Sequence, residues 1–462
     1  MPTDAALLGM LPEHLLLGGI VAAIVAAVLK RGSRVPLIVA CIAVVASACA
    51  AFWLAWNGTV LDPFPGQFTV TPPVLYAKGM LVLLALPVLL MSRTEFEDGE
   101  FSILLLSSVY GMSLLPSAVN ILILFLGLEL LSVPVYAMIV LAYRRSESAE
   151  SALKYLVLSG TATAMFLMGV SLLYGGSGSM ATDVYAQALA ADDLLSRTAV
   201  VLVMAALFVK AGIVPFHAWA PDTYEGASVP VTAYMATLSK AGVLMVAWRL
   251  CDGAELTGPL VGIVAVLALV SVVWGNVTAI RQPSMRRMIA YSSIAHAGYL
   301  FYALLGPSEG RLESITFYLV VYSVANLLAF AVIPSADVDE DRDRLEDFDG
   351  MFSRDPFAAS LLAVAMLSLA GFPPIAGFAA KFLIFREVMA NGYTTYAVLG
   401  LVGSYVGMYF YLRVIQRMFM RHGDGIRTAN DTGRAPARLA GVLSLVAITV
   451  LTVIPGWALA GL

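Results

Sequence analysis

Long runs of apolar residues, separated by short polar segments, recur along the whole chain. Each run holds roughly 20 residues, which is enough for a helix to cross ~30 Å of hydrocarbon. Alternating segments of ~10 residues, the pattern of a transmembrane barrel, are not visible. The pattern therefore predicts an all-α, polytopic membrane protein of about fourteen transmembrane helices. The spans are expected at residues 12–30, 35–56, 73–92, 101–117, 119–142, 149–174, 196–214, 226–249, 256–280, 285–305, 313–334, 357–388, 395–420 and 436–458.

Composition also indicates a membrane protein. Of the 462 residues, 60% are hydrophobic and 13% are charged, whereas a soluble domain carries about 25% charged residues. The stretch MPTDAALLGMLPEHLLLGGI contains Asp4 and Glu13 but no Lys or Arg, so we expect a retained first helix and not a signal peptide. Cys41, Cys49 and Cys251 lack the spacing of a zinc or iron–sulfur site and are interpreted as buried packing residues.

The basic residues of the loops predict the orientation, because inside loops carry an excess of Lys and Arg. With both termini outside, the outside loops contain few basic residues, namely Arg197, Arg249, Arg311 and Arg386. The acidic stretch SADVDEDRDRLEDFDG then lies inside and is interpreted as a solvated connector. The inside loops contain Lys30, Arg31, Arg34, Arg93, Arg144, Arg145, Arg281, Arg286, Arg287, Arg342, Arg344, Arg354, Arg421, Arg427, Arg434 and Arg438.

The lysines are distributed differently from the arginines. Only Lys30 falls in a loop, while nearly all the arginines lie in loops or at span ends. A buried lysine can lose its proton, whereas an arginine keeps it at any accessible pH. A lysine at the bilayer centre costs about 2.5–3.5 kcal/mol on insertion scales, so placing several there indicates proton transfer. The lysines within predicted spans are Lys78, Lys154, Lys210, Lys240 and Lys381.

These lysines differ in how far they lie from the end of their predicted span. Lys78 is near the beginning of its span, so we expect its ammonium to extend to the membrane interface. Lys154 is also near a span end. Two roles stay open for it: its ammonium extends to the interface, or it belongs to a proton relay. The other three have apolar sequence on both sides and are expected to be buried proton carriers.

One carboxylate matches the buried lysines. Glu129 lies about midway along the fifth span, in ILFLGLELLSVPVYAM, with no charged neighbour in sequence. An intramembrane carboxylate needs a cation or a proton. Glu129 is therefore interpreted as one station of a proton relay, with a purely structural ion pair as the alternative.

Two of the predicted spans contain helix breakers close to a lysine. The breakers are Gly212 and Pro215 in LFVKAGIVPFHAW, and Gly371, Pro373 and Pro374 in LSLAGFPPIAGFAAKFLIF. Non-helical backbone at membrane depth is tolerated where it is buried in protein or lines a wet cavity. Two matched breaks therefore indicate a transport site.

The interrupted spans are the seventh and the twelfth, which are five apart. Spans four to eight and nine to thirteen would then be two five-helix repeats, and because five is odd the second repeat must be inverted in the membrane. We expect N-terminal helices in residues 1–100, the first repeat in 101–250, the inverted repeat in 256–420 and a last helix in 436–462.

Two histidines lie near these features. His217 follows the first break, and His296 lies in the tenth span beside Ser292 and Ser293. Histidine can transfer protons near neutral pH, so both are candidate relay residues, and a structural role stays open for each. The sequence contains no recognisable phosphate loop, nucleotide fingerprint, haem motif or nucleophile–base pair.

Five stretches resemble, in the same order, the antiporter-like membrane subunits of proton-pumping NADH:quinone oxidoreductase, respiratory complex I. They are LGLELLSVPVYAM, ESALKYLVLSG, LFVKAGIVPFHAWAPDTYEGASVPVTAYMATLSKAG, RRMIAYSSIAHAGYL and LAGFPPIAGFAAKFLIF. The resemblance is strongest to the N type of subunit. Lys381 stands where the M type has Glu, and the chain ends soon after its fourteenth span, without the long lateral helix of the L type.

The resemblance implies that this chain is a proton-translocating subunit of an enzyme whose redox chemistry occurs elsewhere. NADH, FMN, iron–sulfur clusters and quinone would belong to partner subunits, and this chain would bind no cofactor or metal. The tenth span departs from repeat symmetry, because it has His296 and no carboxylate opposite Glu129. The implied relay residues are Glu129, Lys154, Lys210, Lys240 and Lys381, and His217 also matches.

The implied partners are K-, M- and J-type membrane subunits, the lateral helix of the L type and the lipid bilayer, with no nucleic acid. The implied location is a bacterial-type plasma (inner) membrane, and an organelle membrane stays open. A subunit of a cation/proton antiporter is the main alternative, followed by a membrane-bound hydrogenase module. A scaffold that only spaces its partners is a third alternative, against which the buried lysines weigh.

Overall fold

The computed structural model describes residues 2–29, 34–93, 95–96, 99–141, 146–256, 258–334, 343–421 and 435–462. Among these residues, thirteen helices are long and apolar enough to cross a membrane. The remaining predicted span, the twelfth, consists of two half-length helices. Seven of the basic residues expected on the inside lie outside the described residues: Lys30, Arg31, Arg144, Arg145, Arg342, Arg427 and Arg434.

The N-terminal region contributes three spans and a small β-hairpin. The third span, Pro72–Ser92, consists of two consecutive helices, and the hairpin pairs Leu61 with Val70. The elements are α1 (Pro2–Gly9), α2 (Leu11–Leu29), α3 (Val35–Trp56), β1 (Leu61–Phe64), β2 (Phe68–Val70), α4 (Pro72–Leu83) and α5 (Ala85–Ser92).

The next elements correspond to the expected first repeat. They are α6 (Glu100–Leu114), η1 (Leu115–Ser117), α7 (Ile121–Val140), α8 (Ser146–Ser177), α9 (Asp183–Ala190), α10 (Leu194–Ala211), α11 (Trp219–Gly226), α12 (Val229–Tyr234), the π-helical turn η2 (Met235–Ser239) and α13 (Lys240–Leu250).

The expected second repeat and the last span follow. They comprise α14 (Gly258–Ala279), α15 (Met285–Tyr302), η3 (Ala303–Leu305), α16 (Arg311–Phe330), η4 (Leu345–Phe348), α17 (Met351–Arg354), α18 (Pro356–Ala370), α19 (Ala376–Ala390), α20 (Thr394–Met420), α21 (Ala435–Val453) and α22 (Pro455–Leu459).

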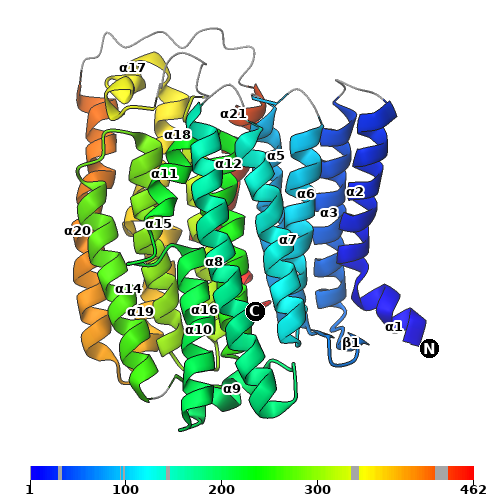
Figure 1. Cartoon of the computed structure of the whole chain (residues 1–462). Helices are drawn as coiled ribbons and strands as arrows, with labels where there is room; N and C mark the ends of the chain where they lie inside the picture. Colours follow the sequence, from blue (N-terminus) through cyan, green and yellow to red (C-terminus); the bar gives the residue numbers. More distant parts are fainter. Residues whose placement is uncertain are drawn as a thin grey trace.

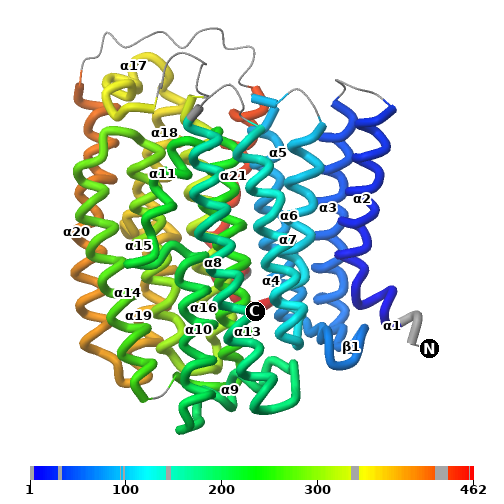
Figure 2. The backbone as a smooth tube through the Cα atoms, viewed as in Figure 1, coloured from blue at the N-terminus to red at the C-terminus, as the bar shows by residue number. Residues whose placement is uncertain are grey.

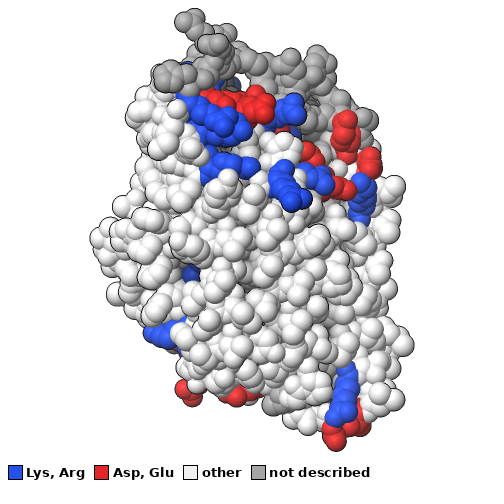
Figure 3. Space-filling model, turned by 90° about the vertical axis from the view of Figure 1, so that its left-hand side faces the viewer, with Lys and Arg blue, Asp and Glu red and all other residues white. Residues whose placement is uncertain are grey.

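The long helices run nearly side by side between two faces of the molecule (Figure 1). One face carries α1, β1 and α9, and we call it the N-terminal face. The opposite face carries the ends of the helices next to Arg34, Arg93, Arg281 and Arg421, and we call it the arginine-rich face. In the space-filling view, charged side chains gather at these two ends, and the broad band between them shows very few (Figure 3). This distribution is typical of a protein that spans a bilayer.

The tube in Figure 2 shows how the regions follow one another across the bundle. The N-terminal helices α2 and α3 lie at one end, α20 lies at the other, and the helices of the first repeat lie between them. Three spans form the interior: Val229–Leu250 is 100% buried in protein, Met285–Leu305 94% and Arg311–Phe330 89%. Lys240 lies in the first of these spans, and Lys210 and Lys381, which lie outside them, are likewise almost fully covered by protein.

Both expected breaks are present, and the chain passes through them in opposite directions. Gly212 and Gly371 each follow the last residue of a helix and adopt left-handed φ angles of 73° and 77°, which favour glycine. In Figure 1, α10 lies toward the N-terminal face and α11 toward the arginine-rich face, whereas α18 and α19 have the reverse placement. This opposite direction is the relationship expected of inverted repeats.

The structure differs from the sequence prediction at the seventh span. The span was expected to end at residue 214, with a loop up to residue 226, but α11 occupies Trp219–Gly226 and completes the crossing. Pro215, Pro221 and Gly226 make this segment look like a loop in sequence, because proline and glycine are poor helix formers. Packing of α11 against α8 and α15 supplies the support that local propensity lacks.

Two smaller expectations were also wrong. Cys49 is exposed on α3, although it was expected to be buried; Cys251 is buried and Cys41 is intermediate. A lipid-facing surface is as apolar as a protein interior, so hydrophobicity does not separate the two. Asp343, in the acidic stretch expected to be solvated, is buried and accepts hydrogen bonds from Ser284 and Arg286.

Candidate functional site

The first candidate cluster joins Glu129 of α7 to Lys210 of α10. The Lys210 Nζ lies 3.1 Å from Glu129 Oε1, with side-chain exposures of 5% and 24%. Lys210 also donates to Ser132 Oγ at 3.3 Å and Ser159 Oγ at 3.1 Å, while Thr163 Oγ1 donates to Glu129 at 2.7 Å. The pair is thus surrounded by hydroxyl groups that can accept and donate protons.

The break after α10 fixes the position of this lysine. Lys210 lies in the last turn of the helix, where a cation is favoured by the free carbonyl groups. Two contacts hold the non-helical segment in place: the indole of Trp219 donates to Val209 O at 2.9 Å, and Val214 N donates to Ser271 Oγ at 2.9 Å. Ser271 belongs to α14, so the second repeat supports the break of the first.

Lys240 is the first residue of α13, directly after the π-helical turn η2. Its ammonium donates to the backbone oxygen of Ser293 at 2.6 Å and also to the Ser293 hydroxyl. Within the described residues, no carboxylate forms an ion pair with Lys240. The positive charge is therefore balanced by the dipoles of Ser293.

Lys381 of α19 is bound at the second break. Its Nζ donates to the carbonyl oxygens of Leu369 and Ala370 and to Ser404 Oγ, each at 3.0 Å, and lies 5.1 Å from the centre of the Tyr299 ring. The two carbonyls belong to the last turn of α18, where they have no helical partner. The broken helix thus supplies the ligands of the ammonium, again with no carboxylate in ion-pair contact among the described residues.

Tyrosine and serine side chains continue the polar region from Lys210 toward Lys240. The rings of Tyr136 and Tyr155 lie 5.2 Å apart. The Tyr136 hydroxyl lies beside Ser159, which binds Lys210, and the Tyr155 hydroxyl lies beside Ser239, which precedes Lys240. The sequence analysis did not single out these tyrosines, because a tyrosine in an apolar span is usually a packing residue.

His296 lies between the second and third lysines. Its Nδ1 lies 2.9 Å from the Tyr318 hydroxyl and its Nε2 lies 3.2 Å from the Tyr411 hydroxyl. His296 and Lys381 line one small cavity with Tyr318, Tyr322 and Ser368, and this cavity leaves ≈ 10 Å³ for the centre of a water molecule. That space holds about one water, so His296 and Lys381 share a site that is polar and narrow.

His217 lies apart from the lysines. It is half-buried in the break between α10 and α11, where its Nε2 accepts a hydrogen bond from Trp274 at 3.0 Å. Its Nδ1 is buried and has no hydrogen-bond partner among the described residues. His217 therefore faces α14, and no contact joins it to the cluster of Glu129 and Lys210.

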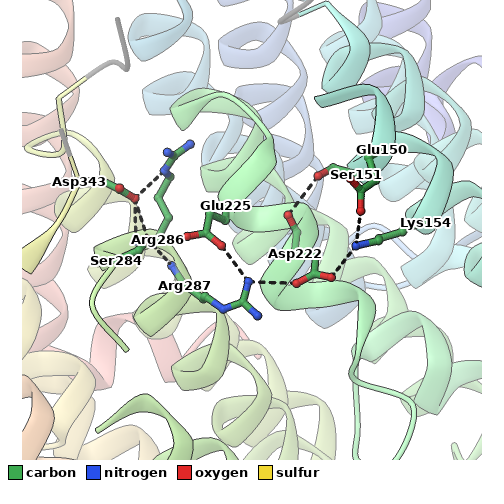
Figure 4. A network of polar contacts seen from close by, with 9 residues as sticks. All are labelled: Glu150, Ser151, Lys154, Asp222, Glu225, Ser284, Arg286, Arg287 and Asp343. Carbon is green, nitrogen blue, oxygen red and sulfur yellow. Dashed lines mark hydrogen bonds and ion pairs between the residues drawn. The ribbon is translucent and has the colours of Figure 1, made fainter. Parts of the chain in front are cut away.

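Lys154 belongs to a different network, near the arginine-rich face (Figure 4). It is 40% exposed and bridges Glu150 at 2.7 Å and Asp222 at 2.8 Å. Asp222 of α11 also binds Arg287 of α15 at 3.0 Å, and Arg287 binds Glu225 at 2.8 Å. This network links the two repeats, and the sequence analysis did not foresee the part played by Asp222 or Glu225.

Lys78 contradicts the expectation that its ammonium extends to the interface. It is fully buried and forms an ion pair with Glu13, whose side chain is 1% exposed. The other carboxylate oxygen of Glu13 has no hydrogen-bond partner among the described residues. Glu13 was interpreted only as a charge near the chain's start. Its partner Lys78 lies two spans later in the sequence, so the pattern around Glu13 does not indicate the contact.

The arrangement can hold and pass protons, and its parts are chemically unequal. Lys210 has a carboxylate partner, whereas Lys240 and Lys381 are bound only by hydroxyl and carbonyl groups. Within the described part of the chain, no group of three or more His, Cys, Asp or Glu side chains is placed to hold a metal ion.

Comparison with known proteins places these features in a family. Residues 118–407 match the family described as NADH:quinone oxidoreductase/Mrp antiporter, TM. The chain is similar to NADH-quinone oxidoreductase subunit N of Pelobacter propionicus, with 35% identity over 471 residues that cover 100% of both proteins. It is also 34% identical to subunit N of Methylococcus capsulatus, over 97% of this chain and 93% of that protein.

Solved structures show the same architecture. A chain of respiratory complex I from Thermus thermophilus is similar with a TM-score of 0.82 and 33% identity, over 97% of this chain and 98% of that chain. A chain of the Mrp complex from a Dietzia species has a TM-score of 0.82 at 20% identity, over 99% and 96% of the two chains. At that identity the second similarity concerns the fold alone.

Proposed function

The chain belongs to the family of N subunits of NADH-quinone oxidoreductase, and we propose that it translocates protons as a membrane subunit of that enzyme. Oxidation of NADH and reduction of quinone take place in other subunits, which hold the FMN, the iron–sulfur clusters and the quinone. This chain converts a conformational change in its neighbours into proton movement. The residues proposed to carry the protons are Glu129, Lys210, Lys240 and Lys381.

The contact between Lys210 and Glu129 is the observation that supports this proposal most strongly. It places an ammonium and a carboxylate 3.1 Å apart inside a membrane protein, beside a broken helix and among hydroxyl groups. Two unit charges 4 Å apart attract each other by about 4 kcal/mol at an effective dielectric constant of 20. Separation of the pair would remove this attraction, which favours the protonated form of Lys210.

The proposed transfer proceeds in three steps along the interior. While Glu129 is ionised and close, Lys210 keeps its proton. When the pair separates, the proton moves past Tyr136, Tyr155 and the serines beside them to Lys240. It then continues by way of Ser293 and the cavity beside His296 to Lys381. Proton transfer along such chains needs groups that both donate and accept, as hydroxyl groups do.

The roles of Lys154 and His217 are less direct. Lys154 is partly exposed and ion-paired near the arginine-rich face, so in this proposal it delivers protons to the relay only from that face. His217 is positioned by Trp274 and forms no hydrogen bond with a lysine of the described residues. Both stay candidates from the family resemblance.

The same proposal gives an orientation and a set of neighbours. The arginine-rich face lies on the inside of a bacterial-type plasma membrane, and both termini lie outside, as the bias of basic residues requires. The neighbours are K-, M- and J-type membrane subunits and the lateral helix of an L-type subunit.

Reconstituted complex tests the function. The complete enzyme in sealed vesicles is given NADH and quinone, and proton movement is measured beside NADH oxidation. Replacement of Lys240 by Met should lower the protons moved per NADH oxidised while the complex stays assembled on a native gel. Normal proton movement in assembled complexes with Lys210→Met, Lys240→Met and Lys381→Met would favour a scaffold role.

A further inference from the structure

An open pocket lies on the N-terminal face, between the ends of α4, α13 and α16. Its volume is ≈ 340 Å³, which is room for about ten water molecules. Val74 of α4 and Thr71 just before this helix line it, together with Trp248 and Arg249 from α13, Glu313 from α16 and other residues of these ends. The pocket is therefore a wet vestibule between the first and second repeats.

The charges at the pocket are nearly balanced. Arg249 is paired with Asp252 at 3.0 Å. Glu313 forms no ion pair with any described residue, and Arg311, two positions earlier in α16, is a buried cation bound to the backbone oxygens of Cys251, Ala254 and Gly306. The carboxylates of Glu313 and Asp252 are therefore groups of the pocket that can accept a proton, without an excess of negative charge.

A stripe of polar groups leads inward from this pocket along α16. Thr316 Oγ1, Ser323 Oγ and Asn326 Oδ1 are buried and have no hydrogen-bond partner among the described residues. Buried polar groups are nearly always satisfied by protein or by water. This helix has five exceptions among the described residues, because Arg311 Nε and the Tyr322 hydroxyl also lack a hydrogen-bond partner. Unpartnered groups of this kind mark places that water reaches in some state of the protein.

The spacing of these groups matches a route across half the membrane. Thr316 lies one helical turn inward from Leu312, which lines the pocket, and Ser323 lies about 10.5 Å further along the same face. α16 packs against η2, the turn directly before Lys240, and against α15, which carries Ser293. The inner part of the stripe therefore belongs to a helix that packs around the middle lysine of the relay.

We propose that Thr316, Ser323 and the pocket at Glu313 form the outlet by which protons leave Lys240 toward the N-terminal face. The proposal rests on the proposed function, and it adds a release route that does not pass through Lys381. The turn between Thr316 and Ser323 carries Leu319 and Val320, both buried. This apolar turn keeps the outlet closed until water enters. A pump needs such a closed state, because a permanently hydrated outlet would let protons flow back.

Substitution of Thr316 tests the outlet in the complete enzyme. Thr316→Val keeps the shape and removes the hydroxyl, and we expect a partial loss of protons released per NADH, equal to the share that leaves by this outlet and not through Lys381. Thr316→Ser keeps a hydroxyl and should pump normally. Ser314→Ala is the matched control, because the Ser314 hydroxyl is already bonded to Gly310 O at 2.8 Å.

Chemical accessibility gives a second readout that does not depend on pumping. In a chain with Cys41, Cys49 and Cys251 replaced by Ser, we expect Thr316→Cys to react during turnover with a small cationic methanethiosulfonate added at the N-terminal face, and not with reagent added at the other face. Absence of reaction in the Thr316→Cys variant, together with normal pumping by Thr316→Val, would overturn the outlet.

The two proposals can fail separately. If Lys240→Met stops proton movement while Thr316→Val and Thr316→Cys behave as the wild type, the outlet is wrong and the relay stands. If Lys240→Met pumps normally, the relay itself is wrong, whatever the Thr316 variants do.

Discussion

The ammonium of Lys210 lies 3.1 Å from a carboxylate oxygen of Glu129, and hydroxyl groups of Ser132, Ser159 and Thr163 bind one or other member of the pair. These hydroxyl groups distinguish the pair from an ordinary buried ion pair, because each charge has other hydrogen-bond partners beside it. A pair with alternative partners can separate at a smaller cost than a dry pair, which is what a switch needs.

Lys210→Arg should keep the positive charge and lose the transfer. Arginine does not release its proton at any accessible pH, so we expect protons moved per NADH to fall by at least about tenfold, the effect of removing a proton-transfer group. The measurement is proton movement in vesicles with assembled complex. Arg197→Lys is the control, because Arg197 is exposed and paired with Asp192; pumping at wild-type level by Lys210→Arg would contradict titration of this lysine.

Glu129→Gln should lower pumping without preventing assembly. The substitution removes the attraction of about 4 kcal/mol that favours protonated Lys210, while Gln can still accept the hydrogen bond from Thr163. Native gels and NADH-driven proton movement, measured on the same membranes, decide between the alternatives. A complex that fails to assemble would show that the pair is structural.

The second buried pair should behave differently. Glu13 and Lys78 are both almost fully buried, and one oxygen of Glu13 has no partner among the described residues. Removing one member leaves an uncompensated charge, which costs about 3–5 kcal/mol, whereas replacing both by apolar residues is often neutral. We expect Lys78→Met to lower the thermal stability of the complex and the double variant with Glu13→Leu to recover it; equal losses in both would show that the pair does not act through charge.

The comparison of these two pairs shows what the sequence could predict. Lys210 was expected to be buried because it has apolar residues on both sides and a break after it, and these are local properties. The partner of Lys78 was not predicted, because Glu13 lies 65 positions away and the two meet only through packing of α2, α4 and α6. The same limit applies to Lys154, whose bond to Asp222 depends on a helix, α11, that its own residues do not favour.

Lys154→Arg distinguishes a structural from a titrating role for this lysine. Its side chain is 40% exposed and bonded to Glu150 and Asp222, and an arginine can make both contacts. If Lys154 only links α8 to α11, Lys154→Arg should pump at nearly the wild-type rate and melt at nearly the wild-type temperature, because exposed ion pairs contribute little to stability. A loss as large as that of Lys210→Arg would instead assign Lys154 to the relay.

Gly377→Ala should disturb Lys381 through the backbone of the second break. A Cβ atom at Gly377 would lie 1.8 Å from Ser368 O, so α18 and α19 could not keep their present distance. Such overpacking typically costs about 1–3 kcal/mol, and it would move the carbonyl groups of Leu369 and Ala370 away from the ammonium. We expect a lower melting temperature together with reduced proton movement.

Gly262→Ala is the matched control, because nothing lies within 4 Å of its Cβ position in α14 and alanine is the better helix former. If both variants pump and melt like the wild type, close contact between α18 and α19 is not what positions Lys381.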